Sequence, residues 1–218
     1  MTQPREPVRV CLINGSLRGR RAASLAFLQD VNRRLGSAGC RTSIVTVRAD
    51  PAEGYPRDML EDMGSADALV FVFPLYSYGL PGALMRLLED YYRYVQTGHP
   101  HPGSAKVYAV INCGFPRPEA VTGEAVRVIQ NLCRRVDLDW RFAVRIGAGP
   151  VVALTRRVPF LDLKLKHAFR ALAADVVGGG APVHDDFFVH PVIPEPVIRR
   201  IKEYYEKKGG MIASGDTA

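Results

Sequence analysis

The sequence predicts an α/β fold built on a doubly wound parallel sheet of five strands in the order 2-1-3-4-5. Strand-like and helix-like segments alternate along the chain, which is typical of consecutive βα units. The most continuous apolar run, DALVFVFP at 67–74, indicates a central strand that is covered on both faces. Right-handed crossovers leave few topologies for such a chain, and five strands fit this order.

Short apolar segments are the expected strands. The first of them, VRVCLIN, ends abruptly in Asn-Gly-Ser, and the fifth ends in glycines. The expected strands span 8–14, 41–48, 67–74, 106–114 and 140–149.

Helical periodicity follows each expected strand. Between residues 80 and 95, leucine and tyrosine side chains recur every three to four positions, which is a strong amphipathic pattern. We expect 1–180 to form one domain and 181–218 to form a C-terminal extension packed on it. The expected helices span 24–35, 58–63, 80–95, 121–136, 161–176 and, in the tail, 197–207.

The composition indicates a globular cytoplasmic protein. Of the 218 residues, 47% are hydrophobic, which is enough to build a core. No apolar run is long enough to span a bilayer, and the N-terminal segment lacks the apolar stretch of a signal peptide. The cysteines show no C-x-x-C spacing, so we expect free thiols and no metal site. They are Cys11, Cys40, Cys113 and Cys133.

The net charge of +7 raises the question of an anionic partner. The basic residues are spread along the chain, with no basic block interleaved with aromatic residues, so we expect no nucleic-acid partner. The charge instead favours attraction of small anions such as phosphorylated cofactors.

Unusual residues follow three of the expected strands. In the 2-1-3-4-5 order, the winding direction changes between the first and third strands, and ligands bind beyond the carboxyl ends there. The loops that begin at 14, 74 and 112 contain glycine, serine, proline, tyrosine and asparagine. We therefore expect the binding site at these three loops.

The first loop has the features of a phosphate site. Backbone N–H groups at a helix N-terminus, the hydroxyls of Ser16 and Ser24, and the guanidinium of Arg18 would all favour an anion. The alternative is an ordinary strand-to-helix turn with a capping serine and solvated arginines. The loop matches neither G-x-x-x-x-G-K-[ST] nor G-x-G-x-x-G, which weakens a nucleoside triphosphate or dinucleotide interpretation.

The second and third loops could hold a flat ring. Tyr76 and Tyr78 lie among glycine and proline, and exposed aromatic side chains on such a loop form a stacking surface. The alternative is that both tyrosines pack on neighbouring helices. Backbone N–H groups around Gly114 could face the polar edge of a flat ligand, although this segment could also be a simple Gly-Pro turn.

Two stretches resemble a known family. INGSLRGRRAASLAFL and DALVFVFPLYSYGLPGALMRLLED are similar to the signatures of flavodoxin-like NAD(P)H-dependent oxidoreductases, the FMN reductase and iron–sulfur flavoprotein superfamily. The resemblance covers roughly 1–180, and the tail also resembles C-terminal extensions in that group. It implies a flavodoxin-like, FMN-binding domain. The implied cofactor-binding residues are Ser16, Arg18, Ser24, Pro74, Leu75, Tyr76, Ser77, Tyr78, Asn112, Cys113, Gly114 and Phe115.

The sequence also departs from the family pattern. Ala22 and Ala23 replace the Asn and Thr of the first signature, so one phosphate-binding hydroxyl is missing. Leu17 replaces the proline of the same signature. Arg20 or Arg21 could compensate, because arginine binds phosphate well. The cluster-binding cysteines of the iron–sulfur members are absent from the sequence.

The resemblance implies an FMN-dependent NAD(P)H oxidoreductase that passes electrons to a small acceptor such as a quinone. The flavin would carry the chemistry, so no catalytic side chain is expected. Two alternatives remain open, namely a flavodoxin-like electron carrier and a non-catalytic interaction module with a degenerate FMN site. Members of the group commonly pair, and Tyr91, Tyr92 and Tyr94 exceed what one core-facing stripe needs, so we expect a homodimer.

Overall fold

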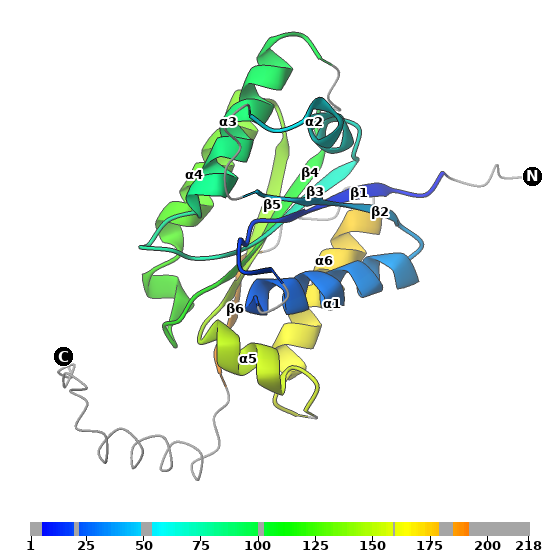
Figure 1. Ribbon diagram of the computed structural model, residues 1–218. Coiled ribbons are helices and arrows are strands. Elements are labelled where there is room, and N and C mark those ends of the chain that lie inside the picture. The colour runs from blue at the N-terminus through cyan, green and yellow to red at the C-terminus, as the bar shows by residue number, and fades with distance from the viewer. Residues whose placement is uncertain are drawn as a thin grey trace, which may run out of the picture.

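A parallel α/β sheet forms the centre of the protein (Figure 1). The computed structural model describes residues 6–19, 22–48, 54–99, 103–158, 160–178 and 185–191. Within these residues the sheet has six strands in the order β2-β1-β3-β4-β5-β6, and every neighbouring pair is parallel. The strands are β1 (Arg9–Asn14), β2 (Arg41–Thr46), β3 (Ala68–Pro74), β4 (Lys106–Asn112), β5 (Asp139–Ile146) and β6 (Phe187–Val189).

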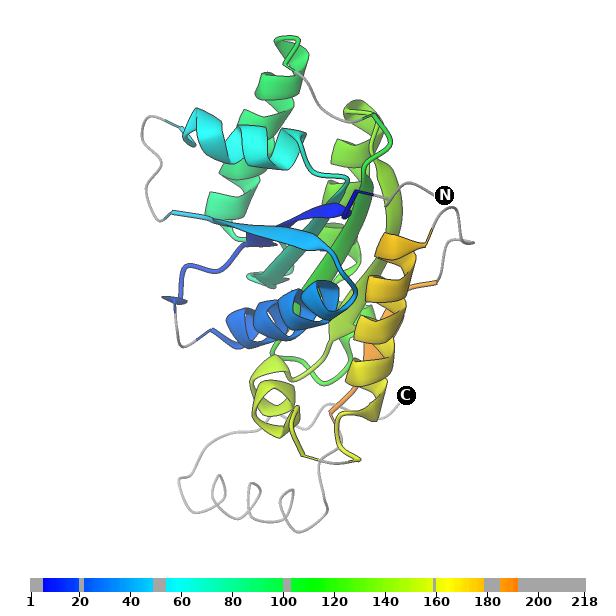
Figure 2. The same ribbon diagram turned by 90° about the vertical axis from the view of Figure 1, so that its right-hand side faces the viewer.

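Helices cover both faces of the sheet, as the two views in Figures 1 and 2 show. Three of them, α2, α3 and α4, bury their apolar side chains against one face, and α1, α5 and α6 bury theirs against the other. The helices are α1 (Ala23–Ser37), α2 (Arg57–Gly64), α3 (Gly82–Gln96), α4 (Gly123–Arg135), α5 (Gly149–Thr155) and α6 (Leu163–Val177), with a short 3₁₀ helix η2 (Pro118–Ala120) before α4.

The predicted fold class is confirmed, and the order 2-1-3-4-5 holds for the five predicted strands. The expected strand at 140–149 was too long, because β5 ends at Ile146 and the glycines beyond it lead into α5, which was not predicted. The four cysteines are free thiols, as expected, and Cys11 and Cys113 are buried. The predicted helix at 197–207 lies outside the described residues, and the division at residue 180 stays a prediction.

A sixth strand joins the sheet from the segment beyond residue 180. Asp186 positions it, because its carboxylate accepts a hydrogen bond of 2.7 Å from the backbone N–H of Ala143 and pairs with Arg145. The ring of Phe187 packs on Phe142, with 5.3 Å between the ring centroids. Strand β6 has three residues, too few for an apolar pattern to reveal it in the sequence.

The amphipathic pattern of α3 is explained almost entirely by the core of this chain. Leu84, Leu87 and Leu88 are buried against the sheet. Tyr91 and Tyr94 are 0% and 8% exposed, so they belong to the same core rather than to a free surface. The surplus of aromatic residues that prompted the homodimer prediction is therefore used within the chain, and the homodimer stays a prediction. Along the described residues, no helix is long and apolar enough to cross a membrane.

A buried ion pair links the beginning of β5 to α6. The guanidinium of Arg141 on β5 donates two hydrogen bonds of 2.9 Å to Asp175, and the Tyr108 hydroxyl donates a third of 2.7 Å. Burial by itself raises the pKa of Asp175, but the hydrogen bonds from Arg141 and Tyr108 outweigh it and hold that pKa below its ordinary value. Asp139 also reaches Arg141, at 3.3 Å, from a more exposed position.

We expect Asp175→Asn to lower the free energy of unfolding by about 3–5 kcal/mol, because it removes the buried carboxylate that accepts two hydrogen bonds from the Arg141 guanidinium. The stabilisation by Asp175 is present above the ordinary aspartate pKa of about 3.9 and is lost as the pH falls through the lower pKa of the folded state. Urea unfolding at several pH values measures both effects. Asp139→Asn is the matched control and should cost less than about 1 kcal/mol, since that carboxylate is 41% exposed. Equal losses in the two variants would contradict this account.

Candidate functional site

A cavity of about 840 Å³ opens where β1, β3 and β4 end. Its walls come from the β1–α1 connection, the first turns of α1, the last residues of β3 and β4, and α5. Five of the predicted site residues line it, so the fold brings part of the predicted site together. They are Ser16, Arg18, Ser24, Pro74 and Asn112, joined by Ala22, Ala23, Leu25, Ala26, Gln29, Pro150, Ala153, Leu154 and Arg156.

The β1–α1 loop passes very close to β3 and α3. Gly15 donates a hydrogen bond of 2.9 Å from its N–H to the carbonyl of Val72. A Cβ atom on Gly15 would stand 2.6 Å from the Cβ of Phe73 and 2.9 Å from a methyl carbon of Leu84, so only glycine fits. The loop then folds over itself, because the N–H of Arg18 donates to the Ser16 hydroxyl at 3.3 Å. The close contact at Gly15 positions the loop so that α1 begins at the cavity.

The N-terminus of α1 is left open toward the cavity. Ala22 is the N-cap residue, and no side chain of the described residues caps the helix there. Ser24 lies within the first turn instead of at the cap, and its hydroxyl is buried without a hydrogen-bond partner among the described residues. Burying a hydroxyl without a partner costs about 1–3 kcal/mol. A ligand atom that accepts a hydrogen bond from the Ser24 hydroxyl would remove this cost.

Asn112 presents a second unpartnered polar atom at the same cavity. Its side-chain oxygen is buried and accepts no hydrogen bond from the described part of the chain. Gly149, the first residue of α5, packs on this side chain so closely that a Cβ would stand 2.8 Å from the amide nitrogen. Asn112 is thus held in place by α5 while its oxygen stays available to a donor.

The tyrosine loop after β3 is a strained two-residue turn. The N–H of Tyr76 donates to the Gly79 carbonyl at 3.0 Å, and the N–H of Gly79 returns a bond of 2.8 Å to Tyr76. The two central residues, Ser77 and Tyr78, have positive φ angles of 47° and 64°, where glycine or asparagine is usual. Each such residue costs about 1–3 kcal/mol and persists where the surroundings enforce it, often at functional sites.

The turn brings two of the predicted loops into contact. The ring of Tyr78 stacks on Phe115 with 5.9 Å between centroids. Tyr76, Tyr78 and Phe115 are 38%, 58% and 49% exposed, so none of them packs into the helix layers. The alternative that both tyrosines are internal packing residues is not what the structure shows. Seven predicted residues of these two loops do not line the 840 Å³ cavity, namely Leu75, Tyr76, Ser77, Tyr78, Cys113, Gly114 and Phe115.

Cys113 is held as a neutral thiol. Burial raises its pKa, and its Sγ donates a hydrogen bond to the Phe115 carbonyl at 3.3 Å. A protonated thiol is a poor nucleophile, so the residue shapes the loop. Gly114 beside it is exposed, and no atom lies within 4 Å of where its Cβ would stand. A flat ligand could therefore approach the backbone at Gly114.

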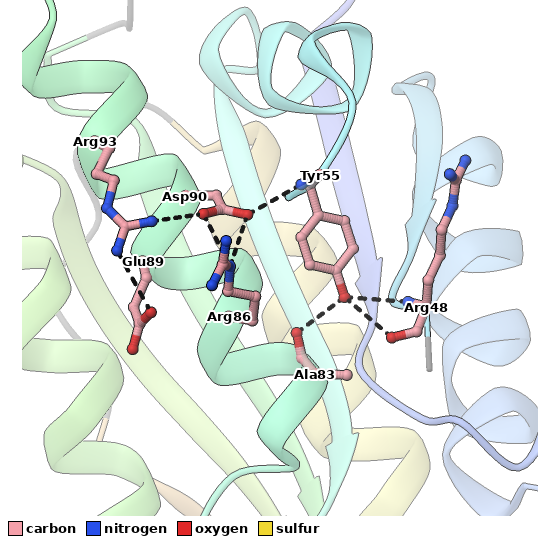
Figure 3. Close-up of polar contacts among 7 residues, drawn as sticks. All are labelled: Arg48, Tyr55, Ala83, Arg86, Glu89, Asp90 and Arg93. Atoms are coloured by element: carbon pink, nitrogen blue, oxygen red, sulfur yellow. Dashed lines mark hydrogen bonds and ion pairs between the residues drawn. The ribbon is translucent and has the colours of Figure 1, made fainter. Parts of the chain in front are cut away.

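A buried carboxylate secures the start of α3, directly after the tyrosine turn (Figure 3). Asp90 accepts hydrogen bonds from the N–H of Tyr55 at 3.0 Å, from Arg86 at 3.3 Å and from Arg93 at 3.1 Å. The hydroxyl of Tyr55 in turn donates to the Ala83 carbonyl at 3.0 Å, in the first turn of α3. The network holds α3 in place through Tyr55, so the turn at 76–79 precedes a firmly positioned helix.

The profile of a family described as NADPH-dependent FMN reductase matches residues 8–134, which run from β1 through almost all of α4. The chain belongs to this family. It is therefore an NAD(P)H-dependent flavin oxidoreductase with FMN as its cofactor. The matched part contains three of the strand ends that form the cavity, together with both aromatic loops.

Solved structures agree on the fold. An NADPH-quinone reductase from P. pentosaceus matches with a TM-score of 0.57 at 12% identity, over 80% of this chain and 99% of that one. An NAD(P)H:quinone oxidoreductase from Methanothermobacter marburgensis matches with a TM-score of 0.55 at 16% identity, over 76% and 99%. At these identities the likeness shows the flavodoxin-like fold alone. A comparison with curated proteins found no match.

The cavity fits FMN on the evidence of its donors and acceptors. An open helix N-terminus and the unpartnered hydroxyl of Ser24 suit a phosphate, and Arg18 lies in the same wall. The free oxygen of Asn112 suits an N–H or hydroxyl donor farther along the cofactor. A volume of about 840 Å³ lies within the usual range of about 300–1,000 Å³ for cofactor sites.

Arg156 lines the cavity and was missed by sequence reasoning. Its Nε lies 3.2 Å from Asp30 of α1, and it also donates to the Ala153 carbonyl of α5. It follows α5, more than a hundred residues after the β1–α1 loop, so spacing could not associate it with Ser16 or Ser24. Arg20 and Arg21, the predicted compensation for Ala22 and Ala23, lie outside the described residues, whereas Arg156 adds a guanidinium to the lining from the end of α5.

We expect Gly15→Ala to lower the free energy of unfolding by about 1–3 kcal/mol, since the added methyl group overlaps Phe73 and Leu84. The control is Gly36→Ala, which makes the same chemical change inside α1, where, apart from the adjacent residues and the backbone of α1 itself, no atom of the described residues lies within 4 Å of the new carbon. That variant should be neutral or gain up to about 1 kcal/mol from helix propensity. Chemical denaturation measures both, and an unaffected Gly15→Ala protein would refute the close approach.

Proposed function

We propose that this protein holds FMN in the cavity at the ends of β1, β3 and β4 and passes electrons from NADPH to a small acceptor such as a quinone. Membership of the family supports the cofactor and the reductant. The observation that carries the assignment of the site is the pair of buried, unpartnered polar atoms, Ser24 Oγ and Asn112 Oδ1, in one cavity beside an open helix N-terminus.

The phosphate end of the cofactor is assigned to the β1–α1 loop. Ser24 would donate its hydroxyl proton, and the N–H groups of the first turn of α1 would add their dipoles. Ser16 could contribute as well, because its hydroxyl accepts from the N–H of Arg18 and still has its own proton to donate. The Arg18 side chain, on the exposed part of the loop, would close the site from the solvent side.

The ring end is assigned to the two aromatic loops. FMN, when bound, supplies hydride acceptance from the nicotinamide and delivery of electrons to the second substrate. Tyr76, Tyr78 and Phe115 would offer aromatic faces to the ring or to a flat acceptor above it, which favours quinone-like compounds. The backbone at Gly114 is open and would present its N–H to the polar edge of the ring.

A one-electron carrier of the flavodoxin kind is the weaker alternative. The matching family is one of NADPH-dependent reductases, and the exposed aromatic loops suit a small flat substrate more than a docking protein. Carriers of that kind often dock through an acidic face, whereas this chain carries a net charge of +7.

The decisive experiment uses the purified full chain. We expect a flavin absorbance spectrum after reconstitution with FMN, anaerobic bleaching by NADPH, and recovery of the oxidised spectrum on addition of a benzoquinone. Failure to bind FMN would refute the site, and bleaching without recovery by any quinone would refute the acceptor class. Reduction by a photochemical donor but not by NADPH would indicate an electron carrier.

We expect Arg18→Ala to weaken FMN binding by about 1.5–3 kcal/mol, the range for a hydrogen bond to a charged group. Ser24→Ala should weaken it as well, while raising stability without ligand, because a buried unpartnered hydroxyl is removed. Fluorescence titration of FMN and thermal unfolding of the apoprotein measure these effects. Arg127→Ala, on the exposed side of α4, is the charge-matched control and should bind FMN normally. Normal affinity in Arg18→Ala would place the phosphate elsewhere.

We expect Tyr76→Ala to lower the affinity for flavin or acceptor by up to about tenfold, since stacking adds about 0.5–1.5 kcal/mol beyond area burial. Tyr78→Ala should act more weakly on affinity, because the Tyr78 ring is already stacked on Phe115. FMN affinity, the KM for quinone and the melting temperature are measured for both variants. If both lose thermal stability while affinity and turnover stay intact, the tyrosines are structural and the assignment of the ring is wrong.

A further inference from the structure

A second cavity, of about 710 Å³, lies between α1 and α6 on the same face of the sheet as α5. Figure 2 shows the two helices side by side over that face. It is separate from the FMN cavity except at Arg156, which lines both. Its lining residues are Asp30, Arg33, Arg34, Ser37, Ala38, Arg156, Arg157, Asp162, Leu165, Lys166, Phe169, Arg170 and Ala173.

This lining is strongly cationic. It holds six arginine or lysine side chains against two aspartates, an excess of four positive charges in a chain whose net charge is +7. The aspartates are already neutralised, since Asp30 pairs with Arg33 and Arg156, and Asp162 pairs with Lys166. The remaining cations therefore set the potential of the cavity.

Three of these cations lack a carboxylate partner within the described part of the chain. They are Arg34, Arg157 and Arg170, and they come from α1, from the segment after α5 and from α6. Guanidinium groups from three segments that converge on one hollow form a site for a phosphate-bearing anion, because arginine donates several parallel hydrogen bonds to phosphate oxygens.

Part of the lining is not cationic. Leu165, Phe169 and Ala173 of α6 form an apolar wall. Asp162, whose side chain is 0% exposed, keeps a carboxylate oxygen that accepts no hydrogen bond from the described residues. An apolar wall suits a planar base, and a carboxylate suits the hydroxyl donors of a ribose. The chemistry is that of a nucleoside joined to phosphate.

We propose that the α1–α6 cavity binds a nucleoside phosphate, in addition to the FMN bound at the strand ends. The ligand's phosphates contact Arg34, Arg157 and Arg170, its base lies against Phe169, and its sugar hydroxyls reach Asp162. Two sources share this chemistry, namely a free nucleotide and the adenosine-phosphate end of NADPH. A small ligand is favoured over a nucleic acid because the cationic groups surround a concave site with an apolar wall and two carboxylates.

The test is calorimetric titration of the FMN-loaded protein with ADP, with adenosine and with inorganic pyrophosphate. We expect ADP to bind beside FMN without displacing it, more tightly than either fragment, and more weakly as salt increases. The double variant Arg34→Ala/Arg170→Ala should lose at least about tenfold in ADP affinity. Arg157→Ala provides an independent second variant and should also bind ADP more weakly.

The control carries the same change of charge on the other face of the sheet. Arg127→Ala/Arg134→Ala on α4 removes two exposed arginines and should leave ADP binding within about twofold of the unmodified protein. No ADP binding up to about 1 mM, displacement of FMN by ADP, or equal losses in both double variants would each overturn the proposal. Tighter binding of a short single-stranded oligonucleotide, lost in the same variant, would replace the nucleotide with a nucleic acid.

Steady-state kinetics then separate the two sources. If NADPH supplies the ligand, its KM rises in Arg34→Ala/Arg170→Ala while the rate at saturation is kept. If a free nucleotide is the ligand, the KM for NADPH is unchanged and ADP binding is still lost. Calorimetry needs no turnover, so an absence of quinone reduction leaves the result on this cavity intact, and the same titration of the protein without FMN gives the result if FMN does not bind.

Discussion

The position of β1 between β2 and β3 determines where chemistry can occur in this protein. Because the winding of the chain reverses there, α1 and α3 leave the same edge of the sheet but cover opposite faces. The loops that lead into them diverge, and the opening between them cannot be filled by either helix. The ends of β3 and β4 form the floor of that opening, and α5 forms one wall. The loops and side chains around this opening determine its shape and its polarity.

Close backbone approaches give the opening its shape. Gly15 lies against Phe73 and Leu84, and Gly149 lies against Asn112, so the β1–α1 loop and the start of α5 each pass where no side chain could be inserted. In the same region, Ser24 Oγ and Asn112 Oδ1 are buried without a hydrogen-bond partner among the described residues. A fold that leaves polar groups unpaired and keeps Ser77 and Tyr78 strained is less stable than it could be. Ligand binding offsets such a cost, which is the usual relation between a preorganised site and its cofactor.

The sequence predicted the parts of this site that local chemistry determines. The β1–α1 loop and the residues at the ends of β3 and β4 follow apolar strands directly, so their place at one edge follows from the topology. Arg156, α5 and β6 could not be found in this way, because their roles depend on contacts with distant segments: Arg156 with Asp30, α5 with Asn112, and β6 with β5. The tyrosines of α3 show the converse error, since helical spacing does not reveal how much aromatic surface the core can absorb.

The distribution of basic residues also depends on contacts between segments that are distant in the sequence. They are spread along the sequence, yet α1, α6 and the segment between α5 and α6 gather six of them around one hollow. Arg156 lines both that hollow and the cavity at the strand ends, and its Nε lies 3.2 Å from Asp30. A phosphate bound in one cavity would draw the Arg156 guanidinium away from an anion in the other cavity. The charges of the two anions would also act on each other directly, because salt screens such charges only beyond about 8 Å. Occupants of the two cavities would therefore influence each other's affinity through this one side chain, and the influence must be equal in both directions.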